Sequence, residues 1–153
     1  MLLQDPSTPL SVQLSGKRSY DIVFDTLEAL PEAMRKASVR PGKVLVITDT
    51  NVAGLYRSRL DEILQGDGWD PFILMLPAGE TTKSPKHLQA IYDAALSWHI
   101  DRRTPVVAFG GGVIGDLAGY AAATLLRGLP FVQVPTSLIA QVDSAIGGKT
   151  GIN

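Results

Sequence analysis

Apolar and polar residues alternate in two short runs near the start of the chain, over residues 10–14 and again over residues 20–24. A Ser-Gly-Lys segment at residues 15–17 separates the runs. This period of two predicts an antiparallel β-hairpin. Residues 1–9 show no such pattern and include Asp-Pro-Ser-Thr-Pro, so they are expected to form a loose leader.

The pattern then changes to helical periods and continuous apolar runs. Four runs predict strands buried on both faces: residues 44–47, 72–76, 106–109 and 131–134. Helical periodicity precedes and separates them. It predicts helices over about residues 27–34, 51–64, 84–96 and 112–127, and a short one from Thr136 or Ser137 to about Asp143. The expected cap of the second helix is Asn51, and that of the third is Ser84, followed by Pro85.

Strands that alternate with helices at this spacing predict βαβ units, and therefore an α/β fold with a Rossmann-like parallel sheet flanked by helices. Ligands of such sheets bind beyond the carboxyl ends of the strands. The segments that follow residues 47, 76, 109 and 134 are therefore expected to face one crevice.

Composition limits the classes of function. The chain has 153 residues, the size of one domain, and we treat residues 1–153 as a single unit. Its net charge of −1 argues against a broad nucleic-acid surface. There is no cysteine, no apolar run of the roughly 20 residues that span a bilayer, and no secretory pattern at the start. We therefore expect a cytoplasmic protein without membrane or nucleic-acid partners.

The turn Gly110–Gly115 matches G-x-G-x-x-G between a strand and a helix. Glycines let the backbone approach a pyrophosphate, and the helix start offers free N–H groups. The alternative is a turn that serves only close packing of helix and strand. The acidic residue that a Rossmann site places at the next strand end is missing, since Pro135-Thr136-Ser137 stands there.

Three other strand ends and turns carry charged side chains. Asp49 could accept hydrogen bonds from a ribose diol or simply cap a helix. Asp116, in the first turn of the glycine-loop helix, is better suited to sugar hydroxyls than to phosphate, which it would repel. Glu80 and Lys83 share a loop over the crevice, a spacing that is also common in solvated loop pairs.

The segment from Gln141 to Gly151 is the densest polar stretch. Its Gly-Gly-Lys-Thr does not complete a P-loop, because Asp143 stands where the first glycine is required. His87 and His99 are too far apart for an H-x-x-x-H metal pair, so no metal site is expected in this chain.

Taken together, these motifs resemble one family, the 3-dehydroquinate synthases. The resemblance is colinear over residues 43–153. It rests on Pro-Ala-Gly-Glu-Thr-Thr-Lys-Ser at 77–84, the glycine turn with Asp-Leu-Ala-Gly at 110–119, Arg127-Gly128, Pro-Thr-Ser-Leu at 135–138 and the segment 141–153.

The resemblance implies a reaction and its cofactor. The family is a lyase of the shikimate pathway and aromatic amino acid biosynthesis, and converts 3-deoxy-D-arabino-heptulosonate 7-phosphate to 3-dehydroquinate and phosphate. Tightly held NAD transiently oxidises a ring hydroxyl, phosphate is eliminated, the ketone is reduced back and the ring closes by an aldol step. The implied partners are this phosphorylated sugar acid and a second subunit, because the family is dimeric.

The resemblance also implies roles for single residues. NAD would be bound by Asp49, Asn51, Glu80, Lys83, Gly110, Gly111, Gly112, Asp116, Thr136 and Ser137. Asp143 and Lys149 would bind substrate hydroxyls, and Arg127 would reach the substrate phosphate of the partner subunit. The family usually has a second threonine where Ser137 stands.

Family members are about twice as long, and their zinc is bound by one glutamate and two histidines of a helical carboxyl-terminal domain. That domain is expected to be absent here, which would leave residues 146–153 as a mobile interdomain segment and the chain inactive alone. Three alternatives stay open: a sister sugar-phosphate cyclase, an iron-type alcohol or glycerol dehydrogenase, and a non-catalytic NAD-binding module.

Overall fold

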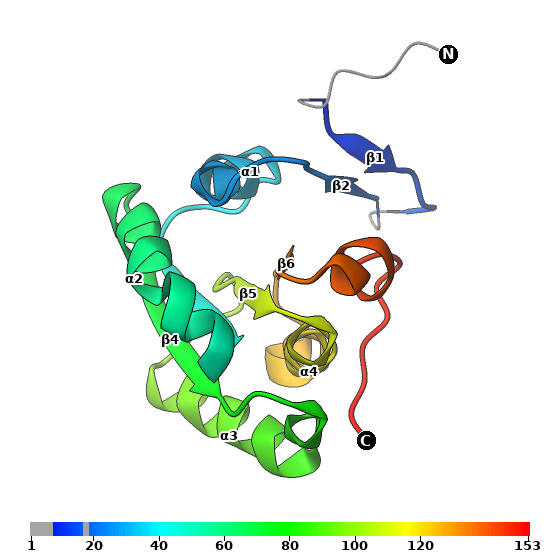
Figure 1. Cartoon of the computed structure of the whole chain (residues 1–153). Helices are drawn as coiled ribbons and strands as arrows, with labels where there is room; N and C mark the ends of the chain where they lie inside the picture. Colours follow the sequence, from blue (N-terminus) through cyan, green and yellow to red (C-terminus); the bar gives the residue numbers. More distant parts are fainter. Residues whose placement is uncertain (1–7, 17–18) are drawn as a thin grey trace. The chain divides into compact units, whose positions relative to one another are not determined.

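The computed structural model describes residues 8–16 and 19–153, and divides the chain into two compact units, residues 1–40 and 41–153 (Figure 1). In the first unit, β1 (Leu10–Val12) pairs antiparallel with β2 (Tyr20–Ile22), which confirms the hairpin. Residues 1–7 of the expected leader and Lys17 of the expected turn lie outside the described residues. A 3-10 turn, η1 (Leu27–Ala29), leads into α1 (Leu30–Lys36).

The second unit is built on a four-stranded, fully parallel sheet in the order β4-β3-β5-β6. The strands are β3 (Lys43–Asp49), β4 (Asp70–Leu76), β5 (Val106–Gly110) and β6 (Phe131–Pro135). Each predicted apolar run lies within one of them. The α/β architecture with a Rossmann-like sheet is therefore confirmed.

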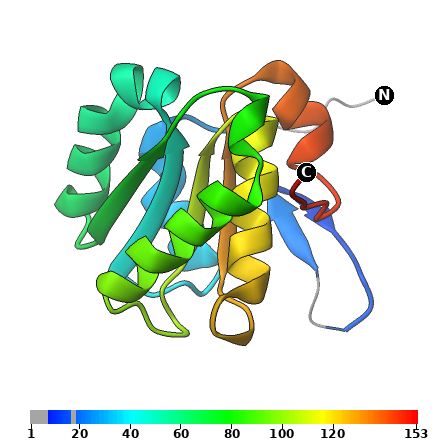
Figure 2. The ribbon, with the colours of Figure 1, turned by 90° about the horizontal axis from the view of Figure 1, so that it is seen from below.

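Helices cover both faces of this sheet. They are α2 (Thr50–Gly66), α3 (Pro85–Ser97) and α4 (Gly112–Thr124), with η2 (Glu80–Thr82), η3 (Leu125–Arg127) and the π-helical turn η4 (Ala140–Ser144) at their ends or in loops. The helices α3 and α4 lie side by side in front of the strands in Figure 2 and share one core with Leu45, Ile47 and Ala108. The alternate face buries Val44 and Val46, and α2 contributes Leu60 and Leu64 outside that shared core.

One helix start differs from expectation, and at another the structure decides between the two expected caps. Asp49, not Asn51, caps α2: its Oδ1 accepts the backbone N–H groups of Asn51 at 2.8 Å and Val52 at 3.1 Å. The carboxylate precedes the first helical turn and can reach two free donors there, whereas Asn51 is already helical. At the last turn, Ser137 rather than Thr136 provides the cap, since its Oγ accepts the N–H of Ala140 at 3.3 Å.

The start of α3 agrees with expectation, whereas α4 ends earlier than expected. Ser84 precedes Pro85 at the beginning of α3, as the sequence predicts. The helix α4 ends at Thr124, and a 3-10 turn continues to Arg127. Leu126 and Arg127 have φ angles of 49° and 72°, which lie in the left-handed region and stop the helix.

The chain connections create a crevice at the carboxyl edge of the sheet. From β3 the chain passes through α2 to the outer strand β4, then returns past β3 to β5 and continues outward to β6. The strand order therefore reverses between the neighbours β3 and β5. Open α/β sheets bind ligands at such a switch point. No described helix is long and apolar enough to cross a bilayer.

Candidate functional site

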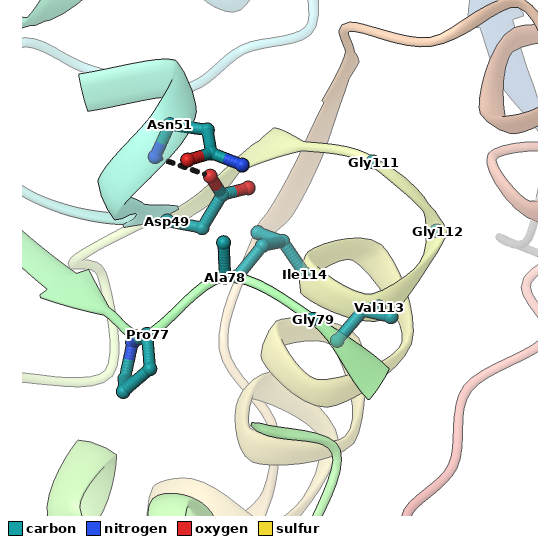
Figure 3. A pocket seen from close by; sticks show the side chains of 9 residues that line it. All are labelled: Asp49, Asn51, Pro77, Ala78, Gly79, Gly111, Gly112, Val113 and Ile114. Carbon is teal, nitrogen blue, oxygen red and sulfur yellow. Dashed lines mark hydrogen bonds between the residues drawn. The ribbon is translucent and has the colours of Figure 1, made fainter. Parts of the chain in front are cut away.

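A pocket of about 170 Å³ lies at this switch point (Figure 3). Its walls come from the ends of three strands and the start of α4. They are Asp49, Asn51, Pro77, Ala78, Gly79, Gly111, Gly112, Val113 and Ile114. The side chains of Asp49 and Asn51 stand on one side, and the backbone of the glycine turn forms the other. One wall of the pocket therefore presents the side-chain oxygen atoms of Asp49 and Asn51, and the opposite wall presents the main chain at the start of α4.

The positions of this turn differ in whether the structure requires glycine there. A Cβ on Gly110 would lie 2.8 Å from Ile114, so this position needs glycine for packing, whereas a Cβ on Gly115 would meet only the end of the flexible Gln133 side chain, 2.8 Å from its Oε1. A Cβ on Gly111 would have only one neighbour, Ser137 Oγ at 3.7 Å, and its φ of −76° suits any residue. Packing therefore explains part of the motif, whereas Gly111 lines the pocket and has no packing contact that requires glycine.

The N-terminus of α4 provides the positive end of this pocket. Gly111 is the N-cap and makes no side-chain capping bond, because it has no side chain. The N–H groups of the first turn remain free for an anion, and the helix dipole adds about half a positive charge there. Gly112 and Val113 belong to that turn and line the pocket.

Asp49 serves the fold and leaves part of its carboxylate available. Its Oδ1 holds the first turn of α2, as described above. Among the described residues, Oδ2 accepts no hydrogen bond. A half-buried oxygen at the pocket wall can accept a bond from a ligand hydroxyl. The two interpretations of Asp49, cap and ligand contact, are therefore compatible in one side chain.

Lys83 and Asp116 form an ion pair beside the glycine turn. The distance from Nζ to Oδ2 is 2.7 Å, and each side chain is 20% exposed. The hydrogen bond that Lys83 donates to Asp116 raises the pKa of Lys83; burial lowers this pKa in part, and the negative charges of Asp116 and Glu80 raise it further. Lys83 is therefore a fixed cation at neutral pH, and the sequence spacing alone gave no reason to pair it with Asp116.

Asp143 and Lys149 are also paired, at the surface. Lys149 Nζ lies 2.6 Å from Asp143 Oδ1, with side chains 66% and 63% exposed. The hydrogen bond and the charge of Asp143 raise the pKa of Lys149. Gly147 and Gly148, with φ angles of 87° and 69°, make the turn that brings the two side chains together. Both groups are accessible to a ligand from solvent.

The structure brings Thr136 and Ser137 to the same edge, because the N–H of Thr136 donates to the carbonyl of Gly110 at 3.0 Å. Arg127 is not brought there. It follows the carboxyl end of α4, whose 13 residues span about 20 Å from the glycine turn. Within one chain, Arg127 therefore lies apart from the other predicted site residues.

The histidines and the metal-binding residue types give no site in the described part of the chain. His87 accompanies Ser84 at the start of α3, with 3.0 Å between Nδ1 and Oγ, and His99 is exposed beyond its end. No group of three or more His, Cys, Asp or Glu among the described residues could bind a metal ion.

Two contributors to this edge were not named as site residues from the sequence. The loop Pro77–Gly79 was expected at the crevice because it follows a parallel strand, but its residues carry no functional group that marks them as part of a site. Asn153 was quoted only within a motif. Its side chain donates to Oε1 of Glu80 at 3.0 Å and its backbone N–H to the carbonyl of Lys83 at 3.0 Å.

Residues 73–153 match the family model described as "3-dehydroquinate synthase N-terminal". The chain belongs to the 3-dehydroquinate synthase family. A curated relative from Salinibacter ruber, named 3-dehydroquinate synthase, is 53% identical over 99% of this chain, and the alignment covers 41% of that relative. A relative of the same name from Agrobacterium fabrum is 50% identical over 90% of the chain and is covered to 37%. The chain thus spans about two fifths of these relatives.

Solved structures of related cyclases share the fold. A 2-deoxy-scyllo-inosose synthase, crystallised with carbaglucose-6-phosphate, NAD+ and Co2+, has a TM-score of 0.84 at 26% identity over 95% of this chain and 40% of its own. The 2-epi-5-epi-valiolone synthase of Streptomyces hygroscopicus, with NAD+ and Zn2+, has a TM-score of 0.78 at 32% identity, over 93% of this chain and 39% of its own. A butanol dehydrogenase from Thermotoga maritima, at 18% identity and a TM-score of 0.58, shares the fold alone over 72% of this chain and 31% of its own.

Proposed function

We propose that this chain forms the NAD-binding part of a 3-dehydroquinate synthase, which converts 3-deoxy-D-arabino-heptulosonate 7-phosphate to 3-dehydroquinate and phosphate. One observation carries the proposal: Gly111 has neither a packing nor a backbone reason to be glycine, yet it lines the pocket at the strand switch point opposite Asp49. A dinucleotide requires this combination of an open backbone for its pyrophosphate and an acceptor for its ribose.

The remaining residues of the edge extend this assignment. Bound NAD supplies a reversible hydride acceptor. Lys83 provides a fixed positive charge beside it, and Asp116 holds that charge in place through the 2.7 Å ion pair. Thr136 and Ser137 offer hydroxyl groups, Glu80 and Asn51 offer polar groups at the rim, and Gly110 and Gly112 keep the turn open.

Asp143 and Lys149 are proposed to bind the substrate. Their 2.6 Å contact is exposed, so a ligand hydroxyl or carboxylate can replace it at little cost. Arg127 is proposed to act on a substrate phosphate bound by a second subunit of a homodimer, because it lies far from the pocket of its own chain. A divalent metal, expected from the family resemblance, would be bound by residues other than those that the structure describes.

Two other functions share parts of this geometry. A sister sugar-phosphate cyclase fits the fold equally well, given the TM-score of 0.84 with a 2-deoxy-scyllo-inosose synthase. The identities of 50–53% with relatives named 3-dehydroquinate synthase favour the proposed reaction. A module that binds NAD without turnover remains an interpretation of the isolated 153-residue chain.

The test is phosphate release from the heptulosonate phosphate with NAD and zinc supplied. We expect no turnover by the 153-residue chain alone, because substrate hydroxyls without a metal lose several kcal/mol of stabilisation and about 1.4 kcal/mol is a tenfold change in rate. Fusion to the remaining part of the Salinibacter ruber relative should give turnover.

Within that fusion, Lys149→Met should lower kcat/KM at least about tenfold, because a hydrogen bond to a charged group is worth roughly 1.5–3 kcal/mol. Lys86→Met, at an exposed position in the first turn of α3, is the matched control and should leave it unchanged. Turnover by the 153-residue chain alone at the rate of the fusion would contradict the assignment.

A further inference from the structure

The four residues that follow Lys149, residues 150–153, lie along α4 and are here called the strap. The methyl group of Thr150 occupies the space where Gly119 lacks a side chain, and a Cβ on Gly119 would collide with it and come within 3.2 Å of the Phe131 ring. Ile152 packs against the core shared by α3 and α4. The strap therefore has defined packing contacts with α4 and with the core.

The strap ends on the turn that carries Glu80 and Lys83. Asn153 makes two hydrogen bonds there, both of 3.0 Å, one from its side chain to Glu80 Oε1 and one from its backbone to the Lys83 carbonyl. The same turn is anchored from within by Thr82, whose buried hydroxyl donates to the Pro77 carbonyl at 2.6 Å. Two residues therefore hold this turn: Asn153 on its exposed side and Thr82 on its buried side.

The strap also reaches the other half of the ion pair. The N–H of Gly151 donates to the backbone carbonyl of Asp116 at 3.4 Å. One short segment therefore binds the backbone of Lys83 and the backbone of Asp116, whose side chains meet at 2.7 Å. A displacement of the strap would change the relative position of these two residues.

We infer that Asn153 is a positioning residue of the NAD site: it holds the Glu80–Lys83 turn so that the Lys83 ammonium stays on Asp116 at the edge of the pocket. The inference rests on the proposed function. The strap directly follows Lys149, so it also connects the segment proposed to bind substrate to the turn beside the NAD site.

The first test compares Asn153→Ala with Gln65→Ala in the 153-residue chain. Gln65 makes a similar amide-to-carboxylate bond, to Asp61 at 3.1 Å, on the exposed side of α2 far from the strap, and is the matched control. Without NAD, amide exchange of Lys83 and Ser84 should be faster in Asn153→Ala only. With NAD, calorimetric titration should show affinity lowered about fivefold, the value of one net hydrogen bond.

The second test reverses the bond. Asn153→Asp places a carboxylate against Glu80 and should weaken NAD binding further than Asn153→Ala does. Glu80→Gln restores a donor and an acceptor in exchanged positions, and because Glu80 is itself proposed to contact NAD, the comparison is made within the Glu80→Gln background: there Asn153→Asp should weaken NAD binding by a smaller factor than it does in the wild-type chain.

The outcomes separate the two proposals. A wild-type chain that does not bind NAD overturns the proposed function. A wild-type chain that binds NAD while Asn153→Ala binds it equally well overturns the positioning role and leaves the proposed function in place. A factor of weakening by Asn153→Asp that is the same in the wild-type and Glu80→Gln backgrounds likewise overturns the positioning role, because the bond between residues 153 and 80 would then be irrelevant to affinity.

Discussion

Asp49 is the residue in which folding and binding are most closely joined. Its Oδ1 accepts two backbone N–H groups at the start of α2, and the same side chain lines the pocket. Stability and ligand affinity at this position can be separated by substitution, because a hydroxyl satisfies the helix cap but cannot accept a bond from a diol as a carboxylate does.

We predict that Asp49→Ser leaves the free energy of unfolding within about 0.5 kcal/mol of wild type, since serine is an equally good cap. Asp49→Ala should lower it by about 1 kcal/mol. Both variants should weaken NAD binding to a similar degree. Urea unfolding and calorimetric titration measure the two quantities. Full NAD affinity in Asp49→Ser would show that the carboxylate is only a cap.

Neighbouring residues show what local sequence can predict. A polar residue before a helical period predicts a cap, but Asp49 and Asn51 both qualify, and only the backbone angles of Asp49, with φ of −107° and ψ of 167°, decide between them. The need for glycine at residue 119 comes from Thr150, 31 positions later, and could not be seen from either residue alone. Pairings such as Lys83 with Asp116 likewise depend on tertiary contacts.

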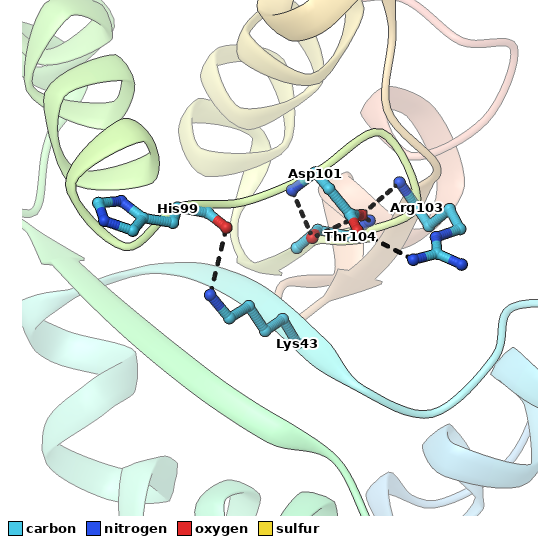
Figure 4. A network of polar contacts seen from close by, with 5 residues as sticks. All are labelled: Lys43, His99, Asp101, Arg103 and Thr104. Atoms are coloured by element: carbon cyan, nitrogen blue, oxygen red, sulfur yellow. Dashed lines mark hydrogen bonds and ion pairs between the residues drawn. The ribbon is translucent and has the colours of Figure 1, made fainter.

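At the scale of elements, α3 has a carboxyl end that is supported from the sheet. Lys43, at the start of β3, donates to the carbonyl group of Trp98 at 2.7 Å and to that of His99 at 3.2 Å, and Figure 4 shows the second of these bonds. Its Nζ also lies 5.0 Å from the centre of the Trp98 ring, which stacks on Phe72. The next turn is closed by Asp101, whose Oδ1 accepts the N–H groups of Arg103 and Thr104.

We predict that Lys43→Met lowers the free energy of unfolding by about 0.5–1 kcal/mol, because a cation at a helix carboxyl end is worth this amount. NAD affinity should not change, since Lys43 lies at the opposite edge of the sheet from the pocket. Lys86→Met, at the start of the same helix, is the control and should not destabilise the chain. An unchanged unfolding midpoint in Lys43→Met would show that α3 does not depend on this support.

The strands and helices themselves were predictable because their signals are strong and local. Continuous apolar runs mark β3, β4, β5 and β6, and every one is part of the parallel sheet. The strand order β4-β3-β5-β6 could not be predicted in the same way, because two of the three connections join neighbouring strands and one crosses β3. That crossover creates the switch point, and no local pattern in the sequence specifies it.

At the scale of the molecule, residues 41–153 form a unit in which the candidate site is built from five separate segments. They are the ends of β3, β4, β5 and β6 and the strap. Packing accounts for Gly110 and Gly119, and the fold leaves Gly111 without such a role. The central claim, that NAD binds at this switch point, therefore depends on Gly111 more than on any other residue.

The most direct measurement is a calorimetric titration of NAD into the 153-residue chain and into Gly111→Ala. The added methyl group meets only Ser137 Oγ at 3.7 Å, so the fold is preserved, but it would lie in the path of the proposed pyrophosphate. Gly66→Ala, which adds the same group in open space at the far end of α2, is the control. We predict saturable binding for wild type and Gly66→Ala, and affinity at least about tenfold lower for Gly111→Ala, equivalent to one lost charge-assisted hydrogen bond. Equal binding by all three proteins, or no heat at millimolar NAD in wild type, would contradict the account.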